Sequence, residues 1–179
     1  MTFTWFILLL TMTGTAFLLL LFHRRFLGHV LHERIPDRPR RRLFVASLSF
    51  FLTFAGVRGV VYCVEHHIPP FHFIEVGGRH IHHLVIGIVI LLFVGYGWLA
   101  EVGTGADDSS IFLSRLMSIL YGAGAALTLD EFALWLNLRD VYWSREGRAS
   151  IDAIILFGAF LAAGAWGAPL FHSKGKKKA

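Results

Sequence analysis

The chain has one cysteine, few charged residues and no motif of a soluble enzyme, and each absence narrows what the protein can be. Cys63 cannot form an intramolecular disulfide or a cysteine-rich metal site. Charged residues are 16% of the 179 residues against 55% hydrophobic residues, which is too apolar a balance for a soluble domain of this length. Neither a nucleophile motif nor a phosphate-binding glycine loop is present. We therefore expect an integral membrane protein.

Apolar runs recur along the chain, and several reach the length of about 20 residues that a helix needs to cross a hydrocarbon core. No β-barrel alternation is present, so we predict an all-α polytopic bundle in one domain, residues 1–173, followed by a basic tail, residues 174–179. The five predicted transmembrane helices are residues 3–22, 43–62, 83–100, 112–138 and 151–171. The first lacks a preceding basic region, so we interpret it as a retained span and not as a signal peptide.

Lys and Arg residues concentrate in two segments, which predicts the orientation. These segments are the loop of residues 23–42 and the tail after the fifth span. Cytoplasmic loops carry the excess of basic residues, so we expect an outer N-terminus and a cytoplasmic C-terminus in a multi-pass protein of the cell membrane. Membrane lipids are the expected partners, with anionic headgroups at the basic loop, and nucleic acid is not expected. Pro36 and Pro39 argue against a continuous helix across the second half of this loop.

Asp130 and Glu131 are adjacent within the fourth apolar run. A carboxylate in the hydrocarbon region is costly and by default marks function. At about 1.5 Å per residue, both acids lie roughly 7 to 9 Å outward of the middle of that run, and Arg58 lies at a similar depth in the second run. Arg58 is therefore the expected counterion. In a continuous helix Glu131 points about 100° away from Asp130, and the sequence does not decide which acid faces the histidines.

Six of the ten histidines fall between His66 and His83, on the side of the membrane where we place the acids. Imidazole is the commonest metal-binding side chain, so we predict a divalent-metal site, with zinc as the expected ion, near the extracytoplasmic face. Its candidate ligands are His66, His67, His80, His82, His83 and Asp130. Asp130 and Glu131 are the candidate catalytic carboxylates, and the further site residues are Arg58, Glu65 and Asp152. The simplest role for Ser150 and Asp152 is to cap the fifth span.

Three elements of the sequence carry a resemblance. Leu127-Thr-Leu-Asp-Glu-Phe-Ala-Leu-Trp135 is followed by Asp140-Val-Tyr-Trp143 and preceded by His80-Ile-His-His83. Together they resemble a family of small uncharacterised bacterial integral membrane proteins, which implies a membrane bundle and no known activity. Far more distantly, acids and histidines on a helical membrane scaffold resemble membrane hydrolases related to alkaline ceramidases. Those have seven spans and a His-x-x-x-His pair that this chain lacks, so no residue role is transferred.

Three functions stay open at this point. A metal-bound water could hydrolyse a lipid or other membrane substrate with a carboxylate as general base, which would make the chain a metal-dependent hydrolase. Alternatively, Asp130, Glu131 and Arg58 could form the proton or cation path of a transporter or channel. The third hypothesis is a non-catalytic membrane subunit with a structural Arg–carboxylate pair. A homo-oligomer is compatible with all three, and the sequence specifies neither the metal nor the substrate.

Overall fold

The computed structural model describes residues 33, 35–71, 75–76, 79–80, 82–138 and 148–171, and these residues are helical apart from two short strands. The helices are α3 (Arg38–Glu65), α4 (His83–Leu99), α5 (Asp108–Asp130), α6 (Phe132–Asn137) and α7 (Arg148–Phe171). Strand β1 (Glu75–Val76) pairs antiparallel with β2 (Arg79–His80) between α3 and α4. The predicted all-helical class is confirmed for this part of the chain. The predicted first span and the basic tail lie outside it.

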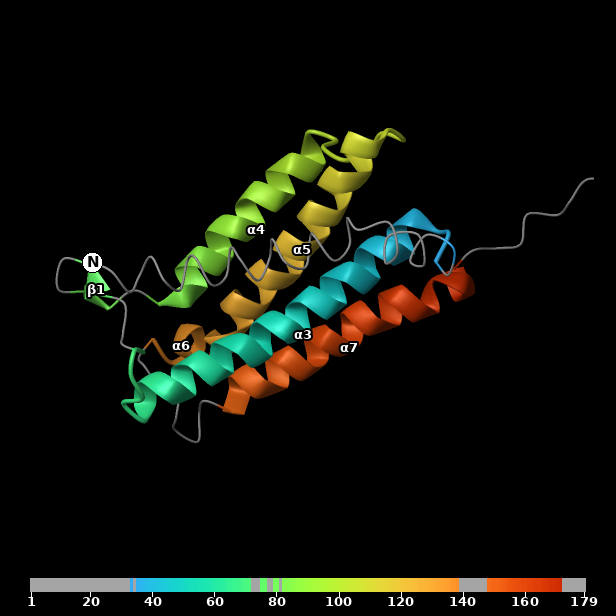
Figure 1. Ribbon diagram of the computed structural model, residues 1–179. Coiled ribbons are helices and arrows are strands. Elements are labelled where there is room, and N and C mark those ends of the chain that lie inside the picture. The colour runs from blue at the N-terminus through green and yellow to red at the C-terminus, as the bar shows by residue number, and fades with distance from the viewer. Residues whose placement is uncertain are drawn as a thin grey trace, which may run out of the picture.

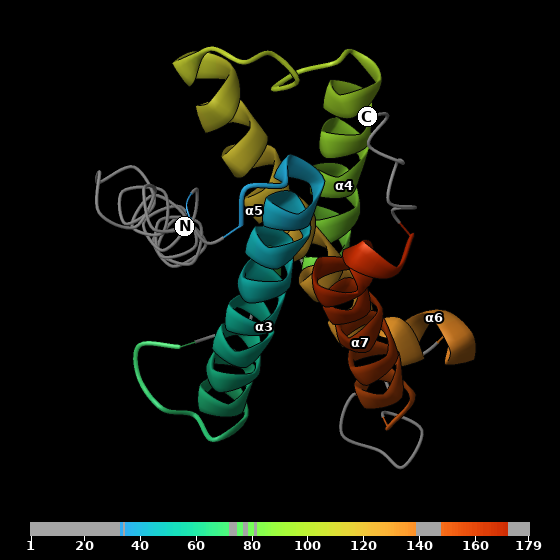
Figure 2. The same ribbon diagram turned by 90° about the vertical axis from the view of Figure 1, so that its right-hand side faces the viewer.

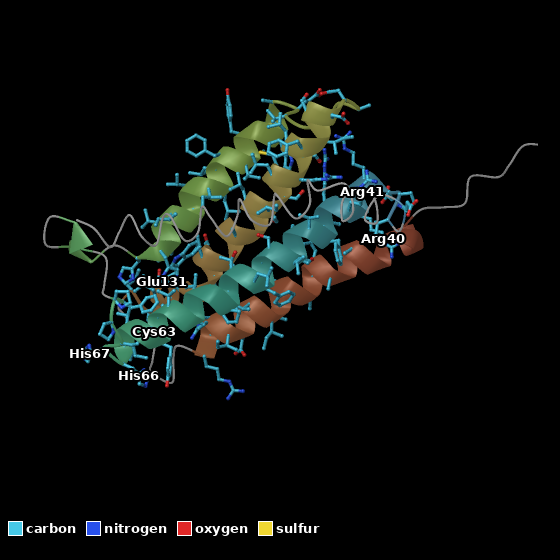
Figure 3. The ribbon with its side chains drawn as sticks, in the orientation of Figure 1. Arg40, Arg41, Cys63, His66, His67 and Glu131 are labelled. Carbon is cyan, nitrogen blue, oxygen red and sulfur yellow. The ribbon has the colours of Figure 1, made fainter. Side chains whose placement is uncertain are left out.

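Helix α5 packs between α4 and α3, and α7 lies along the other side of α3 (Figure 1). The end of the bundle that contains Glu131, here called the acid end, gathers the last turns of α3 and α5 with the first turn of α4 (Figure 1). The opposite end, called the arginine end, contains Arg41 near the start of α3 (Figure 3). Chain direction therefore brings residues from three helices together at each end.

Small residues let the α5 backbone approach both neighbouring helices. A Cβ atom on Gly122 would overlap the carbonyl oxygen of Ala46 in α3, and a Cβ atom on Gly87 of α4 would lie 2.7 Å from the carbonyl oxygen of Gly124. The hydroxyl of Ser49 also donates across the α3–α5 contact, to the carbonyl oxygen of Ile119 at 2.8 Å. Such close approach holds helices together by dispersion and short polar contacts. It fixes the separation of α3, α4 and α5 below the acid end.

Two helices in the described residues, α3 and α5, are long and apolar enough to cross a membrane. Helix α4 is also apolar but has 17 residues. Large apolar side chains face outward from the bundle, among them Phe93 on α4, which is 73% exposed, and Leu156 on α7, which is 72% exposed. An outward apolar surface of this kind suits contact with lipid. The helices thus suggest membrane association, by length and composition alone, and the five-span topology stays a prediction.

Several helix boundaries differ from the predicted ones, and two of these differences have a clear local cause. Helix α3 begins at Arg38, because Pro39 stands in the first turn, where its missing N–H costs no hydrogen bond, and Asp37 caps the helix. Helix α5 ends at Asp130, and Glu131 has φ −105° and ψ 24° before α6 begins. The prediction of one helix over residues 112–138 is therefore wrong. Figure 2 shows α6 turning away from the axis of α5.

The start of α5 is stabilised by its own side-chain cap. The Asp107 carboxylate accepts hydrogen bonds from the Ser110 backbone N–H at 3.0 Å and from the Ser109 hydroxyl. These donors hold the pKa of the Asp107 carboxyl below its usual value, since they favour the charged form. A carboxylate at this position also satisfies N–H groups that have no partner within the helix.

Candidate functional site

Asp130, the last residue of α5, joins three helices at the acid end. Its side chain is fully buried, and its Oδ1 accepts a hydrogen bond from Arg58 Nε of α3 at 2.6 Å. Its Oδ2 lies 3.1 Å from Nε2 of His83, the first residue of α4. A buried carboxylate is tolerated when it is both paired with a charge and hydrogen-bonded. Asp130 meets both conditions through side chains of its own chain.

Glu131 caps the N-terminus of α4 from outside that helix. Its Oε2 accepts a hydrogen bond from the backbone N–H of Leu84 at 2.9 Å, and its Oε1 lies 2.7 Å from Nδ1 of His82. His82 is the N-cap residue of α4 but makes no capping hydrogen bond with its own side chain. The Glu131 carboxylate supplies the missing acceptor, and a negative charge is favourable at a helix N-terminus. The break between α5 and α6 places it there.

His83 connects the two acids. Besides its Nε2 contact with Asp130, its Nδ1 lies 3.7 Å from Oε2 of Glu131. His83 thus lies between the carboxylates of Asp130 and Glu131, and Arg58 approaches Asp130 from α3. We use the name clamp for the five side chains of Arg58, His82, His83, Asp130 and Glu131.

Ser150 extends this polar region to α7. It was expected to cap the fifth span, but α7 begins at Arg148, so Ser150 and Asp152 both lie within the helix. The prediction of a cap is therefore wrong. The Ser150 hydroxyl oxygen accepts a hydrogen bond from the backbone N–H of Ala133 at 2.9 Å. Ser150 thus satisfies an N–H group in the first turn of α6, which opens directly after the break at Glu131.

Four of the remaining predicted site residues, His66, His67, Glu65 and Asp152, lie outside the clamp. His66 and His67 are exposed just beyond the end of α3 (Figure 3), where the His66 ring stacks on Tyr62 with 3.9 Å between ring centroids. Neither histidine makes a hydrogen bond or ion pair with Asp130 or Glu131. Glu65, at the end of α3, and Asp152, on α7, are also exposed. His80 lies in β2, and its side chain is outside the described part of the structure.

No group of three or more His, Cys, Asp or Glu side chains among the described residues is arranged to hold a metal ion. The clamp does contain two imidazoles and two carboxylates, but they contact one another in pairs and one oxygen is taken by a guanidinium. The predicted zinc site therefore stays a prediction.

Sequence reasoning identified the charged members of the clamp but not the backbone donor and the serine. The Leu84 N–H follows from the start of α4 at His83, because the first N–H groups of any helix need an acceptor. Ser150 had no such signal, since its contact depends on how α6 packs against α7. Both become visible only when the helices are placed in space.

No protein-family model matches the chain, and neither the curated proteins nor the solved structures contain a significant match.

Proposed function

We propose that this chain is a non-catalytic, multi-pass membrane protein in which the clamp is a structural element of the bundle. One observation carries the proposal: each of the four carboxylate oxygens of Asp130 and Glu131 is engaged by a side chain or backbone group of the same chain. Buried charges within a membrane must meet partners. Here the partners come from α3 and from the first residues of α4, so the acids hold these helices to the end of α5.

Hydrolysis would require Asp130 or Glu131 to contact water and substrate. A general base needs an oxygen within hydrogen-bond reach of the attacking water and of substrate, whereas Asp130 is completely buried and Glu131 is 7% exposed. A zinc ion would need ligand atoms at about 2.0–2.2 Å, and it would have to displace the hydrogen bonds that the carboxylate oxygens already accept. The clamp geometry favours a structural role over either chemistry.

A transport path would need polar groups that continue toward the arginine end. Below the acids, the buried residues of α5 are mainly apolar, and its buried polar side chains there, Thr128, Ser118 and Ser114, carry hydroxyl groups and no ionisable group. A cavity of about 330 Å³ is lined by apolar and aromatic side chains of α4, α5 and α7 together with Thr128, and by no acidic or basic side chain. These side chains supply no ionisable group that could carry a proton or a cation onward, which again favours the structural role.

The proposal is tested by metal content and stability measured on the same preparations. The full chain, Asp130→Asn and the control Asp152→Asn are purified in detergent without chelator, and each is analysed for bound metal and for equilibrium unfolding. Asp152 is exposed on α7, so the control makes the same chemical change outside the clamp. We expect no stoichiometric metal in any of the three and a loss of stability for Asp130→Asn only.

Two results would overturn the structural role. Stoichiometric zinc in the full chain that disappears in Asp130→Asn would support the metal site instead. Equal stability of the full chain and Asp130→Asn would show that the clamp does not hold the bundle. Ion flux in proteoliposomes that is abolished by Glu131→Gln would favour transport and would also count against the proposal.

A further inference from the structure

The cavity of about 330 Å³ between α4, α5 and α7 has the size and lining of a site for an apolar molecule. Gly95 and Trp98 line it from α4, Tyr121 and Thr128 from α5, and Phe157 from α7. Aromatic rings from all three helices follow one another along its wall. The ring centroids of Trp98 and Tyr121 are 5.4 Å apart, and those of Tyr121 and Phe157 are 6.4 Å apart. Small-molecule sites have volumes in this range and a mostly apolar lining with a few polar groups.

Two residues of this lining hold a buried polar atom that has no hydrogen-bond partner among the described residues. These atoms are Nε1 of Trp98 and Oγ1 of Thr128. A threonine hydroxyl within a helix can donate to the carbonyl oxygen one turn earlier, whereas an indole N–H only donates and finds no such acceptor in its own helix. A buried donor without an acceptor costs free energy. An acceptor inside the cavity would therefore satisfy Trp98.

The surface beside the cavity is apolar, which indicates the phase from which an occupant enters. Leu92 follows a lining residue of α4 and is 68% exposed, and Phe160 lies one turn after Phe157 on α7 and is 69% exposed. Such side chains suit contact with lipid. Trp98 is the last residue but one of α4, and tryptophan at the end of a membrane helix lies at the level of the lipid headgroups. The ester carbonyl groups of diacyl lipids lie next to that level.

We propose that the cavity binds one acyl chain of a diacyl membrane lipid, and that the ester carbonyl of this chain accepts a hydrogen bond from Nε1 of Trp98. The lining of α5 runs from Tyr121 to Leu129, which is about 12 Å of helix at 1.5 Å per residue and suits an elongated chain. An ester carbonyl only accepts hydrogen bonds, which complements a group that only donates. The torsion about the Cβ–Cγ bond of tryptophan is broad, so the indole can turn its N–H toward the carbonyl oxygen.

The first test compares two lipids that differ only at the carbonyl groups. One is a diester phosphatidylcholine, and the other is the diether phosphatidylcholine with the same chains, which lacks both carbonyls. Binding of each lipid to the detergent-solubilised full chain is measured by native mass spectrometry. The full chain should bind the diester lipid about five-fold more tightly, a factor that one hydrogen bond of ordinary strength contributes. Trp98→Phe keeps an aromatic ring but removes the N–H, so it should bind both lipids equally.

The second test fills the cavity with a side chain. A Cβ atom added to Gly95 would meet no atom within 4 Å, so Gly95→Leu has room for its side chain but occupies part of the cavity. Gly56→Leu is the matched control, because Gly56 is an exposed glycine of α3 that has the same free space and lies outside the cavity lining. Gly95→Leu should bind the diester lipid about ten-fold more weakly than Gly56→Leu, since burial of two methylene groups contributes about that factor.

A preference for the diester lipid that is lost in Trp98→Phe, together with weaker binding by Gly95→Leu than by Gly56→Leu, supports the proposal. Equal binding of the two lipids by the full chain overturns it, and so does equal binding of the diester lipid by the two leucine variants. If Gly95→Leu does not fold, Gly95→Val and Gly56→Val give the same comparison. The inference rests on the membrane location in the proposed function but not on the clamp, whose tests are metal content and stability, so the two proposals can fail separately.

Discussion

The Asp130–Arg58 ion pair offers the sharpest quantitative test of the clamp. Breaking a buried pair by removing one partner typically costs about 3–5 kcal/mol, whereas an interhelical hydrogen bond in a membrane averages about 0.6 kcal/mol. Asp130 is completely buried, while the Arg58 side chain is 22% exposed and can turn toward water when its partner is lost. We therefore expect Asp130→Asn to cost about 3 kcal/mol and Arg58→Met more, because Arg58→Met leaves the buried carboxylate with one cationic partner fewer.

The double variant Asp130→Asn/Arg58→Met isolates the interaction between the two side chains. It should cost about 2 kcal/mol less than the sum of the single variants, since neither charge is then left without the other. The assay is equilibrium unfolding of the full chain in mixed micelles, followed by helical circular dichroism. Arg148 and Asp152, exposed one turn apart on α7, give a control cycle whose coupling should be about 0.5 kcal/mol or less. Additivity of the Asp130 and Arg58 variants within about 0.5 kcal/mol would refute the reasoning.

Five further substitutions test the contacts around the clamp and along α5 and α3. Glu131→Gln should cost about 1 kcal/mol of stability, since the amide keeps an acceptor but removes a charge from the N-terminus of α4. Hydrogen exchange at the Leu84 amide should become faster in this variant, and unchanged exchange would contradict the capping role of Glu131. Gly122→Ala should cost about 1–3 kcal/mol of stability, because the added methyl group would overlap α3. Gly59→Ala, whose added methyl group meets no neighbouring atom, should instead stabilise α3 by up to about 1 kcal/mol. Equal effects of the two substitutions on thermal unfolding would be inconsistent with close packing of α5. Ser150→Ala should cost about 1 kcal/mol of stability and speed hydrogen exchange at the Ala133 amide. Continued protection of that amide would exclude this role of Ser150. The pKa of Asp107 is lowered in the folded chain, so its stabilisation of α5 is present above the unfolded pKa of 3.8 and is lost as the pH falls through the folded pKa. The stability of Asp107→Ala should therefore depend less on pH in acid than that of the full chain. Identical acid unfolding profiles of the two proteins would exclude this contribution.

Much of the helical framework follows from hydrophobic length. The predicted third span, residues 83–100, and helix α4, His83–Leu99, differ by one residue, because the apolar run there is bounded by a histidine and by a polar turn. Helix α3 extends beyond the predicted residues 43–62 at both ends. Hydropathy marks the part of a helix that suits hydrocarbon, whereas the helix itself continues through charged residues as long as its backbone is satisfied.

The residues that form the clamp could also be predicted from the sequence. Charged residues in apolar runs are rare enough to stand out, and the predicted topology placed Arg58 and the two acids at a similar depth, with His83 on the same side of the membrane. The partners of each acid could not be predicted from the sequence, because they depend on the rotation of α5 and on the break at Glu131. A continuous helix would have separated the acids onto different faces.

The sequence by itself determined that the described chain is helical and that Asp130 and Glu131 would need cationic or proton-donating partners. Apolar runs and buried charge impose both conclusions wherever the helices lie. Only the tertiary structure decided that Asp130 meets both Arg58 and His83, and that Glu131 caps α4. The physical reason is that a carboxylate at a helix break can reach the N–H groups of a neighbouring helix, and no pattern along one chain segment encodes where that neighbour begins.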